Sequence, residues 1–566
     1  MLSKNSKKRI LNQFLAPLLG LFLLSLMTGC SFFFDKFSDP TYDVVNLDSK
    51  DFGIVFSHNV NGETHPCGCR HFPLGGLPQV AGALEKLKKT QTVVYLDTGD
   101  TLFASNNIPK SLEKSQTFNA KELAGALSKV GLRYWLPGDQ DFAKGVPFLA
   151  EVLKETKIQP VISNLVNPKT IDHKEIVLFE KGPHKIFLVG LINPAVMGSQ
   201  YKQLFKAPEV VFPELLKKLE AKGLKKNDPF HRLVVLSHAG INRDEQLAKQ
   251  FPNIDWIVGA HTMNFLRFAQ EEGKVKIAQV LSRNHYLGHI TFSMSGDKSK
   301  DSYEIIEVRE ELKDELKPNP YLAFIDRHKE SLSVVQKKEQ DEMVQGNLGT
   351  IRYSTSNSCL DCHDKQTEFW RGTAHSLAYH TLVMAKEENN LTCVKCHSLG
   401  LGDIKGFTKV SNMIEFDKAR HRLELSKDGG KELGERYWSE LKEAFGKTKS
   451  IRDMASSKRK KLSHTWFKHD QEYSVNRNFA NVQCLNCHSQ HEGHPFDKFD
   501  PIPSREQKMA GMRNKCLNCH DSDQSPEWYE TRPNGLPGAP DQDIISKKVE
   551  LISCPKLTAE ERQEFN

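Results

Sequence analysis

Residues 359–363 read Cys-Leu-Asp-Cys-His, and the same C-x-x-C-H pattern returns three times before residue 521. Two thiols three positions apart reach the two vinyl groups of one porphyrin, and the next residue presents an imidazole to the iron. The pattern therefore predicts four covalently bound c-type haems. The residues concerned are Cys359, Cys362 and His363; Cys393, Cys396 and His397; Cys484, Cys487 and His488; and Cys516, Cys519 and His520.

A zinc ribbon is the alternative, because paired C-x-x-C motifs also hold zinc. Zinc ribbons do not need a histidine after every second cysteine, whereas all four motifs here have one.

We expect this region to be mainly α-helical, with haem faces replacing much of the apolar core. Residues 415–461, between the second and third motifs, are charged and helix-prone, and Gly429-Gly430 interrupts them.

Residues 355–525 resemble the tetrahaem cytochromes of the hydroxylamine-oxidation type. In that family a Trp-x-x-Ser-x-His run follows the first motif, and Trp370 to His375 matches it with Thr373 in place of the serine. The resemblance makes His375 the first candidate for a distal axial ligand. Further candidates are His491 and His494, and then His380, His421, His464 and His469. Two alternatives stay open for the irons. Every iron is six-coordinate, or one iron keeps an open position that binds a small molecule.

Residues 52–310 alternate short β-branched runs with helical patterns, which predicts a layered α/β sandwich. Expected strands cover 53–56, 93–96, 161–163, 186–191, 233–236, 256–258 and 276–281, and expected helices cover 79–89, 119–129 and 244–250. Polar blocks stand at several strand ends. They are Ser57-His58-Asn59-Val60-Asn61-Gly62, Asp97-Thr98-Gly99-Asp100, Gly138-Asp139-Gln140-Asp141-Phe142, Ser237-His238 and Gly259-Ala260-His261-Thr262-Met263.

The order of these blocks resembles the calcineurin-like metallophosphoesterases, and most closely the catalytic domain of the 5′-nucleotidase family. That family uses two metals to clamp a phosphoryl group and activate a water. The resemblance places one metal, zinc, manganese or iron, at a set of four residues: Asp100, Asp139, His238 and His261.

The ligands of the other metal are poorly matched. Asn59 replaces an aspartate, Asn61 and Met263 each replace a histidine, and Gln140 replaces the histidine that stabilises charge on the phosphoryl group. We therefore expect one divalent metal, with two as the alternative, and poor or absent nucleotidase chemistry.

Cys67 and Cys69 lie in the loop after the first polar block, within His65-Pro66-Cys67-Gly68-Cys69-Arg70-His71. Three roles stay open for them: a strained redox disulfide, a pair of thiolate ligands for the depleted metal position, and a structural loop. Domains similar to this one can carry selenocysteine in the same loop, and this resemblance implies redox chemistry there.

The first thirty residues predict export. Lys4, Lys7, Lys8 and Arg9 precede an apolar run from Leu15 to Met27, which is short for a membrane span. The run ends at Thr28-Gly29-Cys30 and resembles a bacterial lipoprotein signal, which implies lipidation of Cys30. We expect a periplasmic location with a lipid anchor in a bacterial membrane, the outer membrane being favoured. An uncleaved signal anchor is the alternative.

The 566 residues thus divide into a signal (1–30), a tether (31–51), the α/β domain (52–310), a linker (311–354), the tetrahaem domain (355–525) and a loosely packed tail (526–566). The formal charge of +7 is modest, and no basic stripe with interleaved aromatic residues predicts nucleic-acid binding.

The resulting hypothesis is a membrane-tethered redox protein whose haems exchange electrons with the metal cleft and with a partner protein or a quinone-linked chain. One alternative is a phosphohydrolase acting on a nucleotide or another small phosphoester, with an accessory cytochrome. The other is a non-catalytic binding domain attached to an electron carrier.

Overall fold

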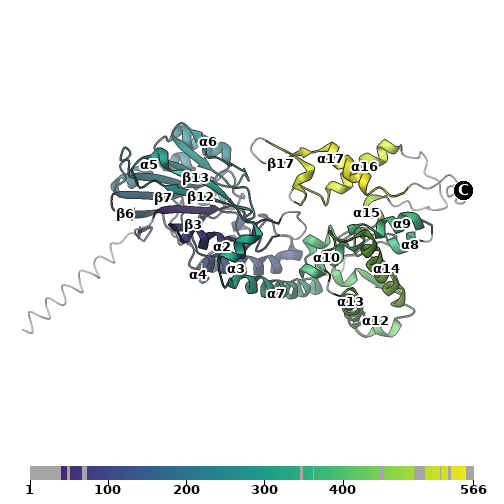
Figure 1. The fold of residues 1–566 in the computed structure, drawn as a ribbon. Helices are drawn as coiled ribbons and strands as arrows, with labels where there is room; N and C mark the ends of the chain where they lie inside the picture. Colours follow the sequence, from purple (N-terminus) through teal and green to yellow (C-terminus); the bar gives the residue numbers. More distant parts are fainter. Residues whose placement is uncertain are drawn as a thin grey trace, which may run out of the picture.

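The computed structural model describes residues 40–47, 51–66, 73–343, 348–360, 362–446, 448, 450–489, 504–522, 524–532 and 537–555. Within them, a layered α/β part is followed by helix α7 (Pro320–Glu342) and then by a mainly helical part (Figure 1). The candidate residues that lie outside the described ranges are Cys30, Cys67, Cys69, His491 and His494.

Two β-sheets pack face to face in the α/β part, where Phe52 of one sheet contacts Phe179 of the other. The central strands of each sheet are parallel, so their carboxyl ends meet at one edge. The seven-stranded sheet runs β1 (Tyr42–Asn46), β6 (Ile176–Lys181), β7 (His184–Ile192), β8 (His231–His238), β9 (Trp256–Gly259), β11 (Val275–Ala278) and β10 (Gln270–Glu272). The six-stranded sheet runs β13 (Ser302–Glu307), β12 (Tyr286–Phe292), β2 (Phe52–Ser57), β3 (Thr92–Asp97), β4 (Leu132–Trp135) and β5 (Gln159–Pro160).

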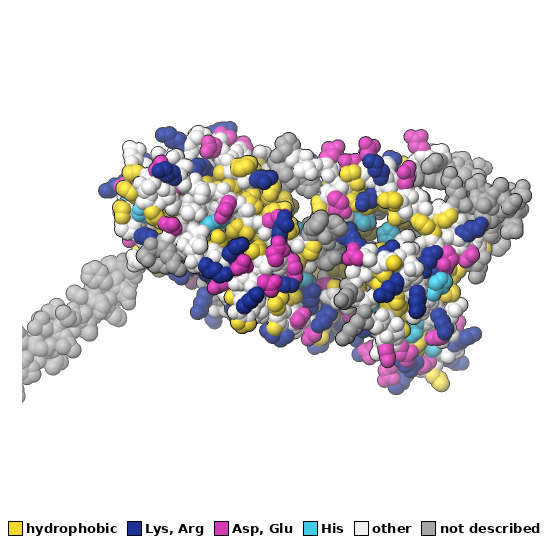
Figure 2. All heavy atoms as spheres, viewed as in Figure 1, with side chains coloured by type: hydrophobic (Ala, Val, Ile, Leu, Met, Phe, Trp, Pro, Cys, Tyr) yellow, Lys and Arg dark blue, Asp and Glu magenta, His cyan; other side chains and the backbone are white. Residues whose placement is uncertain are grey.

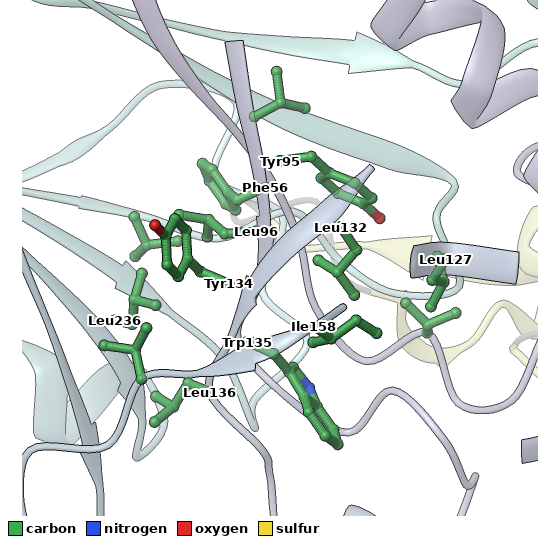
Figure 3. Packing of buried hydrophobic residues seen from close by; sticks show 14 of the residues in the cluster. Phe56, Tyr95, Leu96, Leu127, Leu132, Tyr134, Trp135, Leu136, Ile158 and Leu236 are labelled. Carbon is green, nitrogen blue, oxygen red and sulfur yellow. The ribbon is translucent and has the colours of Figure 1, made fainter. Parts of the chain in front are cut away.

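Helices cover the outer faces of both sheets (Figure 1). Helices α5 (Pro208–Ala221) and α6 (Ile241–Gln250) pack on the seven-stranded sheet. Helices α2 (Leu77–Lys88), α3 (Glu113–Val130) and α4 (Gly145–Glu155) lie on the other side. All eight residues of β8 are buried, and its middle part from Leu233 to Leu236 is a continuous apolar run because the sheet is covered on both faces. Figure 3 shows the packing around Phe56, Leu96 and Leu236, each worth about 1.5–3 kcal/mol on burial.

Six of the seven expected strands have a counterpart, and the three expected helices overlap α2, α3 and α6. The strand predicted over 161–163 is wrong. Strand β5 ends at Pro160, and Val161 makes only an isolated bridge to Lys174. The chain leaves the sheet there because the next two N–H groups donate to carbonyls outside it, those of Lys174 and Gly190.

Helix α7 occupies much of the segment predicted as a linker. Its first turn is capped by the Asn319 side chain, which accepts from the N–H of Tyr321. Its last turns cap α3 in return, since Glu339 accepts from the N–H groups of Lys114 and Ser115. Helix α7 therefore packs against the α/β part and is not a free linker.

The region after α7 contains the helices α8 (Ser356–Cys359), α9 (Asp364–Arg371), α10 (Ala378–Ala385), α11 (Leu391–Val394), α12 (Arg422–Asp428), α13 (Lys431–Phe445), α14 (Ser456–Glu472), α15 (Cys484–Cys487) and α16 (Arg505–Leu517), with a two-stranded sheet of β14 (Ile414–Phe416) and β15 (Val475–Asn478). Helices α12 and α13 are separated by Gly429 and Gly430, both left-handed, at the predicted break.

This helical region has its own apolar core, so the prediction of little core is wrong. Helix α13 buries Leu433, Tyr437, Leu441 and Phe445, which recur every four residues along one face. They share a cluster with Trp466 of α14 and with Phe479 beside the small sheet. Side-chain packing among α10, α13 and α14 thus supplies an apolar core for this region.

The tail is also more ordered than predicted. It contains the hairpin of β16 (Tyr529–Thr531) and β17 (Pro537–Pro540), followed by α17 (Gln542–Leu551). Ile545 and Val549, one turn apart on α17, are buried together with Trp528. This apolar face packs α17 against α16. The polar composition of residues 526–566 gave no sign of this packing in the sequence.

The face of the molecule in Figure 2 has basic and acidic side chains interspersed over both parts. Many of them are paired, as in Lys121–Glu151 of α3 and α4 and in Lys337–Glu435 of α7 and α13. Among the described residues, none of the helices combines the length and the apolar character that a membrane crossing demands.

His328 of α7 predicts a specific sensitivity to acid. Its ring is 2% exposed, stacks between Phe118 and Phe324, and bonds to Asn119 through Nε2 at 2.9 Å. Burial, together with the charge of His65, lowers the pKa of His328 to about 4. Because the unfolded side chain titrates near 6.5, the unfolded state binds more protons between these values, and stability is lost as the pH falls through that window.

We expect His328→Gln to unfold more easily than the wild type at pH 7 but to lose about 2 kcal/mol less stability between pH 7 and pH 5. Urea unfolding of both proteins at the two pH values measures the difference, in which the other histidines cancel. An equal loss in both proteins would contradict this assignment.

Candidate metal centre and haem-attachment motifs

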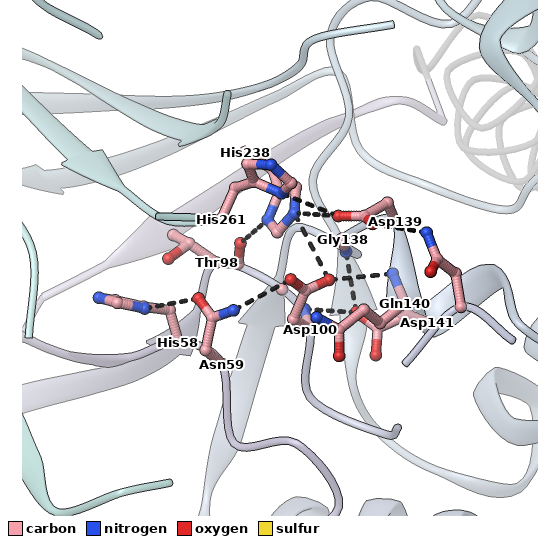
Figure 4. A network of polar contacts seen from close by, with 12 residues as sticks. His58, Asn59, Thr98, Asp100, Gly138, Asp139, Gln140, Asp141, His238 and His261 are labelled. Carbon is pink, nitrogen blue, oxygen red and sulfur yellow. Dashed lines mark hydrogen bonds and ion pairs between the residues drawn. The ribbon is translucent and has the colours of Figure 1, made fainter. Parts of the chain in front are cut away.

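The carboxyl edges of the two sheets bring four predicted ligands together. Asp100 follows β3, Asp139 follows β4, His238 ends β8 and His261 follows β9. One ligand atom from each of them lies within 4.8 Å of all the others (Figure 4). The convergence follows from the parallel strands, whose carboxyl ends share one edge.

Asp139 lies at the centre of this cluster. Its Oδ1 is 3.0 Å from His238 Nε2 and 3.0 Å from His261 Nδ1, while Asp100 Oδ1 is 3.5 Å from the same Nε2. The other ring nitrogen of His238 donates to the carbonyl of Thr98 at 2.8 Å. Such a bond fixes the tautomer in which Nε2 faces the cluster, as is usual for metal-bound histidines.

The charges of the cluster are strongly coupled. Burial raises the pKa of Asp100, and the nearby His238 charge opposes that rise. Burial acts on Asp139 in the same direction, but hydrogen bonds from His238 and His261 outweigh it and lower its pKa well below the usual range. Burial would lower the pKa of His238, whereas Asp100 and Asp139 raise it to about 9. Two carboxylates and two imidazoles at such close range are a donor set that suits a divalent zinc, manganese or iron ion.

Asp141 builds the loop that holds the cluster. Its carboxylate accepts from the backbone N–H groups of Gly138, Asp100, Thr101 and Leu102 at 2.7–2.9 Å. Gly138 is required next to it, because a Cβ there would lie 2.4 Å from Asp100 Oδ1 and 2.4 Å from His238 Cε1. The sequence block around Asp139 contained both residues, but nothing in it signalled these supporting roles.

Asn59, Asn61, Gln140 and Met263, which stand where the resemblance expects the residues of a second metal site, are not part of the four-ligand cluster. Asn59 and Asn61 are both left-handed, and the N–H of Asn61 donates to the Asp100 carbonyl, which keeps this loop beside the cluster. The amide of Asn59 contacts Asp100 through Nδ2 rather than through its oxygen. Gln140 donates its backbone N–H to Asp100 Oδ1, while its buried Oε1 has no partner among the described residues. Met263 is 43% exposed.

The C-x-x-C-H motifs adopt a common local geometry. In three of them the N–H of the histidine donates to the carbonyl of the first cysteine, as in His363 to Cys359, at 2.8–3.0 Å. A helical turn of this kind puts residues i, i+3 and i+4 on one face. Among the described residues, none of the eight motif cysteines forms a disulfide. The Cys359 thiol is hydrogen-bonded to Cys484, and Cys396 to Cys519, so motifs one and three are neighbours, as are two and four.

Two motif histidines have one ring nitrogen already engaged. His397 Nδ1 lies 2.6 Å from the carbonyl of Ala378, and His520 Nδ1 lies 2.9 Å from the hydroxyl of Ser525. His520 also stacks on Trp528 with ring centroids 4.2 Å apart. When Nδ1 of a neutral imidazole donates to such an oxygen, the lone pair is on Nε2, which is the nitrogen that a metal would bind.

His375 lies beside both of these histidines. Its ring centroid is 6.4 Å from that of His520. Burial, with the neighbouring His520 and His397 charges, lowers the pKa of His375 to about 4. The side chain is therefore neutral at physiological pH, which is the form that binds a metal.

The four other candidate histidines of this region have protein partners. His380 bonds to Thr448, His421 to Glu424 and to the Tyr473 carbonyl, and His469 to the Tyr437 carbonyl. His464 forms an ion pair with Glu368 at 2.9 Å and contacts Arg371. These contacts place His380, His421 and His469 in the packing of α10, α12, α13 and α14, whereas His464 is exposed and pairs with residues of α9.

Comparison with known proteins points to two families, one for each part. The family described as "Cytochrome c554 and c-prime" matches residues 358–417, which include the first two C-x-x-C-H motifs. "Protein 5NUC" of Lutzomyia longipalpis is 25% identical over 294 residues, covering 46% of this chain and 48% of its own length. An apyrase of Anopheles gambiae is 27% identical over 264 residues, covering 41% of this chain and 45% of its own.

The α/β part is 5′-nucleotidase-like in sequence. Among solved structures, a 5′-nucleotidase precursor from Thermus thermophilus aligns with a TM-score of 0.40 and 17% identity, over 59% of this chain and 67% of that one. The chain spans about half the length of the curated relatives named above.

Proposed function

We propose that this chain is an exported, lipid-anchored multihaem c-type cytochrome that exchanges electrons with its own one-metal, 5′-nucleotidase-like domain. Haem groups at the four C-x-x-C-H motifs carry the electrons, to or from a redox partner protein or a quinone-linked chain. The metal cleft takes a small molecule, with a phosphoester as the class that its relatives suggest. The observation that supports the proposal best is the tight connection between the two parts.

That connection has two elements. His65, in the loop that follows Asn59 and Asn61, lies 3.2 Å from Glu387, six residues before Cys393 of the second motif. Gln340 of α7 donates to the Asn389 carbonyl at 2.8 Å and accepts from the N–H of Val410 at 3.0 Å. Burial would raise the pKa of Glu387, but the bond from His65 lowers it, which favours an ion pair at this contact. These contacts bring the loop that follows Asn59 and Asn61 against the segment before the second motif, and electron exchange between two centres requires such proximity.

At the cleft, Asp100, Asp139, His238 and His261 would hold the metal. When bound, a divalent ion polarises an oxygen of the substrate and lowers the pKa of a coordinated water. Thr98 keeps His238 in the ligating tautomer, and Asp141 holds the loop that carries Asp100. Cys67 and Cys69 stay in the proposal as redox or thiolate groups of the adjacent loop.

A phosphohydrolase with an accessory cytochrome is the second candidate. The names of the relatives, 5′-nucleotidase and apyrase, favour it. It differs from the first proposal in needing a second metal for efficient hydrolysis, so metal content separates the two.

We expect the exported chain, expressed with a haem-ligation system, to carry four covalent haems and about one divalent metal. Mass spectrometry of the mature protein and its absorption spectrum measure the haem content, and elemental analysis measures the metal content. The variant Cys516→Ala with Cys519→Ala is the matched control and should lose one haem while keeping the metal. Fewer than three haems, or zinc alone at the cysteines, would overturn the proposal.

A further inference from the structure

A chain of three hydrogen bonds runs from the backbone into the metal-ligand cluster. The N–H of Val280 donates to His58 Nε2 at 2.8 Å, His58 Nδ1 meets Asn59 Oδ1 at 2.8 Å, and Asn59 Nδ2 donates to Asp100 Oδ2 at 3.0 Å. Figure 4 shows the last two of these bonds. His58, Asn59 and Asp100 are all buried, so water does not compete for any of them.

The direction of each bond follows from the first. A backbone N–H can only donate, so His58 Nε2 accepts and the proton of the neutral ring is on Nδ1. The Asn59 atom that faces Nδ1 must then be its oxygen, which leaves the NH₂ group for Asp100. The orientation of the Asn59 amide is thereby fixed by Val280, 222 residues away from His58 along the chain. Burial lowers the pKa of His58 to about 4, which keeps the ring neutral.

The two oxygens of Asp100 consequently have different surroundings. Oδ1 faces His238 and accepts from the N–H of Gln140 at 3.0 Å, on the side of the four-ligand cluster. Oδ2 accepts from the amide of Asn59. A carboxylate can be shared by two cations by giving one oxygen to each, and that mode needs both oxygens to be available. Here the second oxygen has a neutral N–H donor in the place of a cation.

We propose that Asn59 is a positioning residue that satisfies Asp100 Oδ2 by a hydrogen bond and so makes Asp100 the ligand of a single cation. The inference rests on the proposed one-metal cleft and names the residue that sets its stoichiometry. With Asn59 in place, the cluster has two carboxylates, whose charge one divalent ion balances. An aspartate at position 59 would add a third carboxylate beside Asp100 Oδ2 and remove the donor, so a second cation would be needed there.

The test uses the full haem-loaded chain, stripped of divalent metal and dialysed against Mn²⁺. Elemental analysis gives manganese per chain, and electron paramagnetic resonance separates an isolated Mn²⁺ from a coupled pair. We expect one manganese in the wild type and two, magnetically coupled, in Asn59→Asp. Without metal, Asn59→Asp should melt at a lower temperature than the wild type and should be stabilised more by Mn²⁺.

Two further variants keep the proposal falsifiable. Asn59→Leu removes the donor without adding charge and should weaken Mn²⁺ binding by about 10–100-fold, as loss of a residue that orients a metal ligand does. Asn106→Asp is the matched control, because the exposed Asn106 donates to Asp139 Oδ2 at 2.9 Å and undergoes the same chemical change. It should keep one manganese.

The outcomes are distinct. One manganese in the wild type and one in Asn59→Asp, with unchanged affinity in Asn59→Leu, would overturn the role of Asn59 and leave the proposed one-metal function standing. A second manganese in Asn106→Asp would also overturn it, since added charge alone would then explain the gain. Two in the wild type would refute this role and favour the phosphohydrolase. None in the wild type would overturn the proposed metal cleft itself.

Discussion

Supplied with excess Mn²⁺ or Zn²⁺, the full chain is expected to hydrolyse nucleoside monophosphates at least about 10³-fold more slowly than a two-metal 5′-nucleotidase assayed beside it. The second cation of such enzymes stabilises the attacking or leaving oxygen by several kcal/mol, and each 1.4 kcal/mol changes a rate about tenfold. Here the amide N–H of Asn59 donates a hydrogen bond to the second oxygen of Asp100, Oδ2. Gln140 has a neutral side chain and so offers no charged donor to the phosphoryl group. An ion held by the cluster would therefore lack the second cation of the two-metal enzymes.

Phosphate release from AMP, measured together with metal content, tests this expectation. His238→Ala is the control for background hydrolysis, because it removes a buried ligand whose ring nitrogens both have partners. Rapid, metal-dependent hydrolysis with two metals per chain would refute the prediction and favour the phosphohydrolase. Cys67 and Cys69 would then be the first residues to examine as additional ligands.

Replacement of His375 by alanine is expected to convert one of the four haems from low spin to high spin. Two imidazoles that bind one metal from opposite sides have ring centres about 6 Å apart, from metal–nitrogen bonds of about 2 Å. The His375 and His520 centroids are separated by 6.4 Å. Ser525 holds the Nδ1 of His520, so its Nε2 is left for the iron. We therefore expect His375 to be the partner of His520 if a haem is attached at Cys516 and Cys519.

Electron paramagnetic resonance and the absorption spectrum of the oxidised protein measure the spin state. His380→Ala is the matched control, since burial lowers the pKa of His380 to about 4 as well, yet its Nε2 bonds to Thr448. It should leave all haems as they are in the wild type. An unchanged spectrum in His375→Ala would remove this residue from the list of axial ligands.

The sequence predicted the sandwich well where strands are buried on both faces, because β2, β3, β7, β8 and β9 are nearly continuous apolar runs. The sequence did not predict the core of the helical part, because the apolar residues there are separated by charged ones. The four buried residues of α13 lie among Lys, Glu and Arg in a segment that reads as a solvated helix. Their spacing of four residues was the available signal, and the abundance of charge obscured it.

The candidate metal ligands were predictable because each stands at a strand end in a recognisable block. The orientation of Asn59 was not predictable. It depends on a bond between His58 and the backbone of Val280, whose side chain has no part in it. In the same way, Ser525 and Trp528 beside His520 lie in a stretch whose composition gives no sign of a contact with a haem motif.

The bond from Val280 to His58 also has a consequence for biogenesis. A chain that is threaded through a membrane from its N-terminus delivers Asp100 and Asp139 long before His261 and Val280 emerge. The cluster is incomplete, and Asn59 is not yet oriented, until roughly half of the polypeptide has been translocated. In an exported chain the cluster would therefore take its ion from the pool on the far side of the membrane, so the metals abundant in that compartment would contribute to which ion is bound.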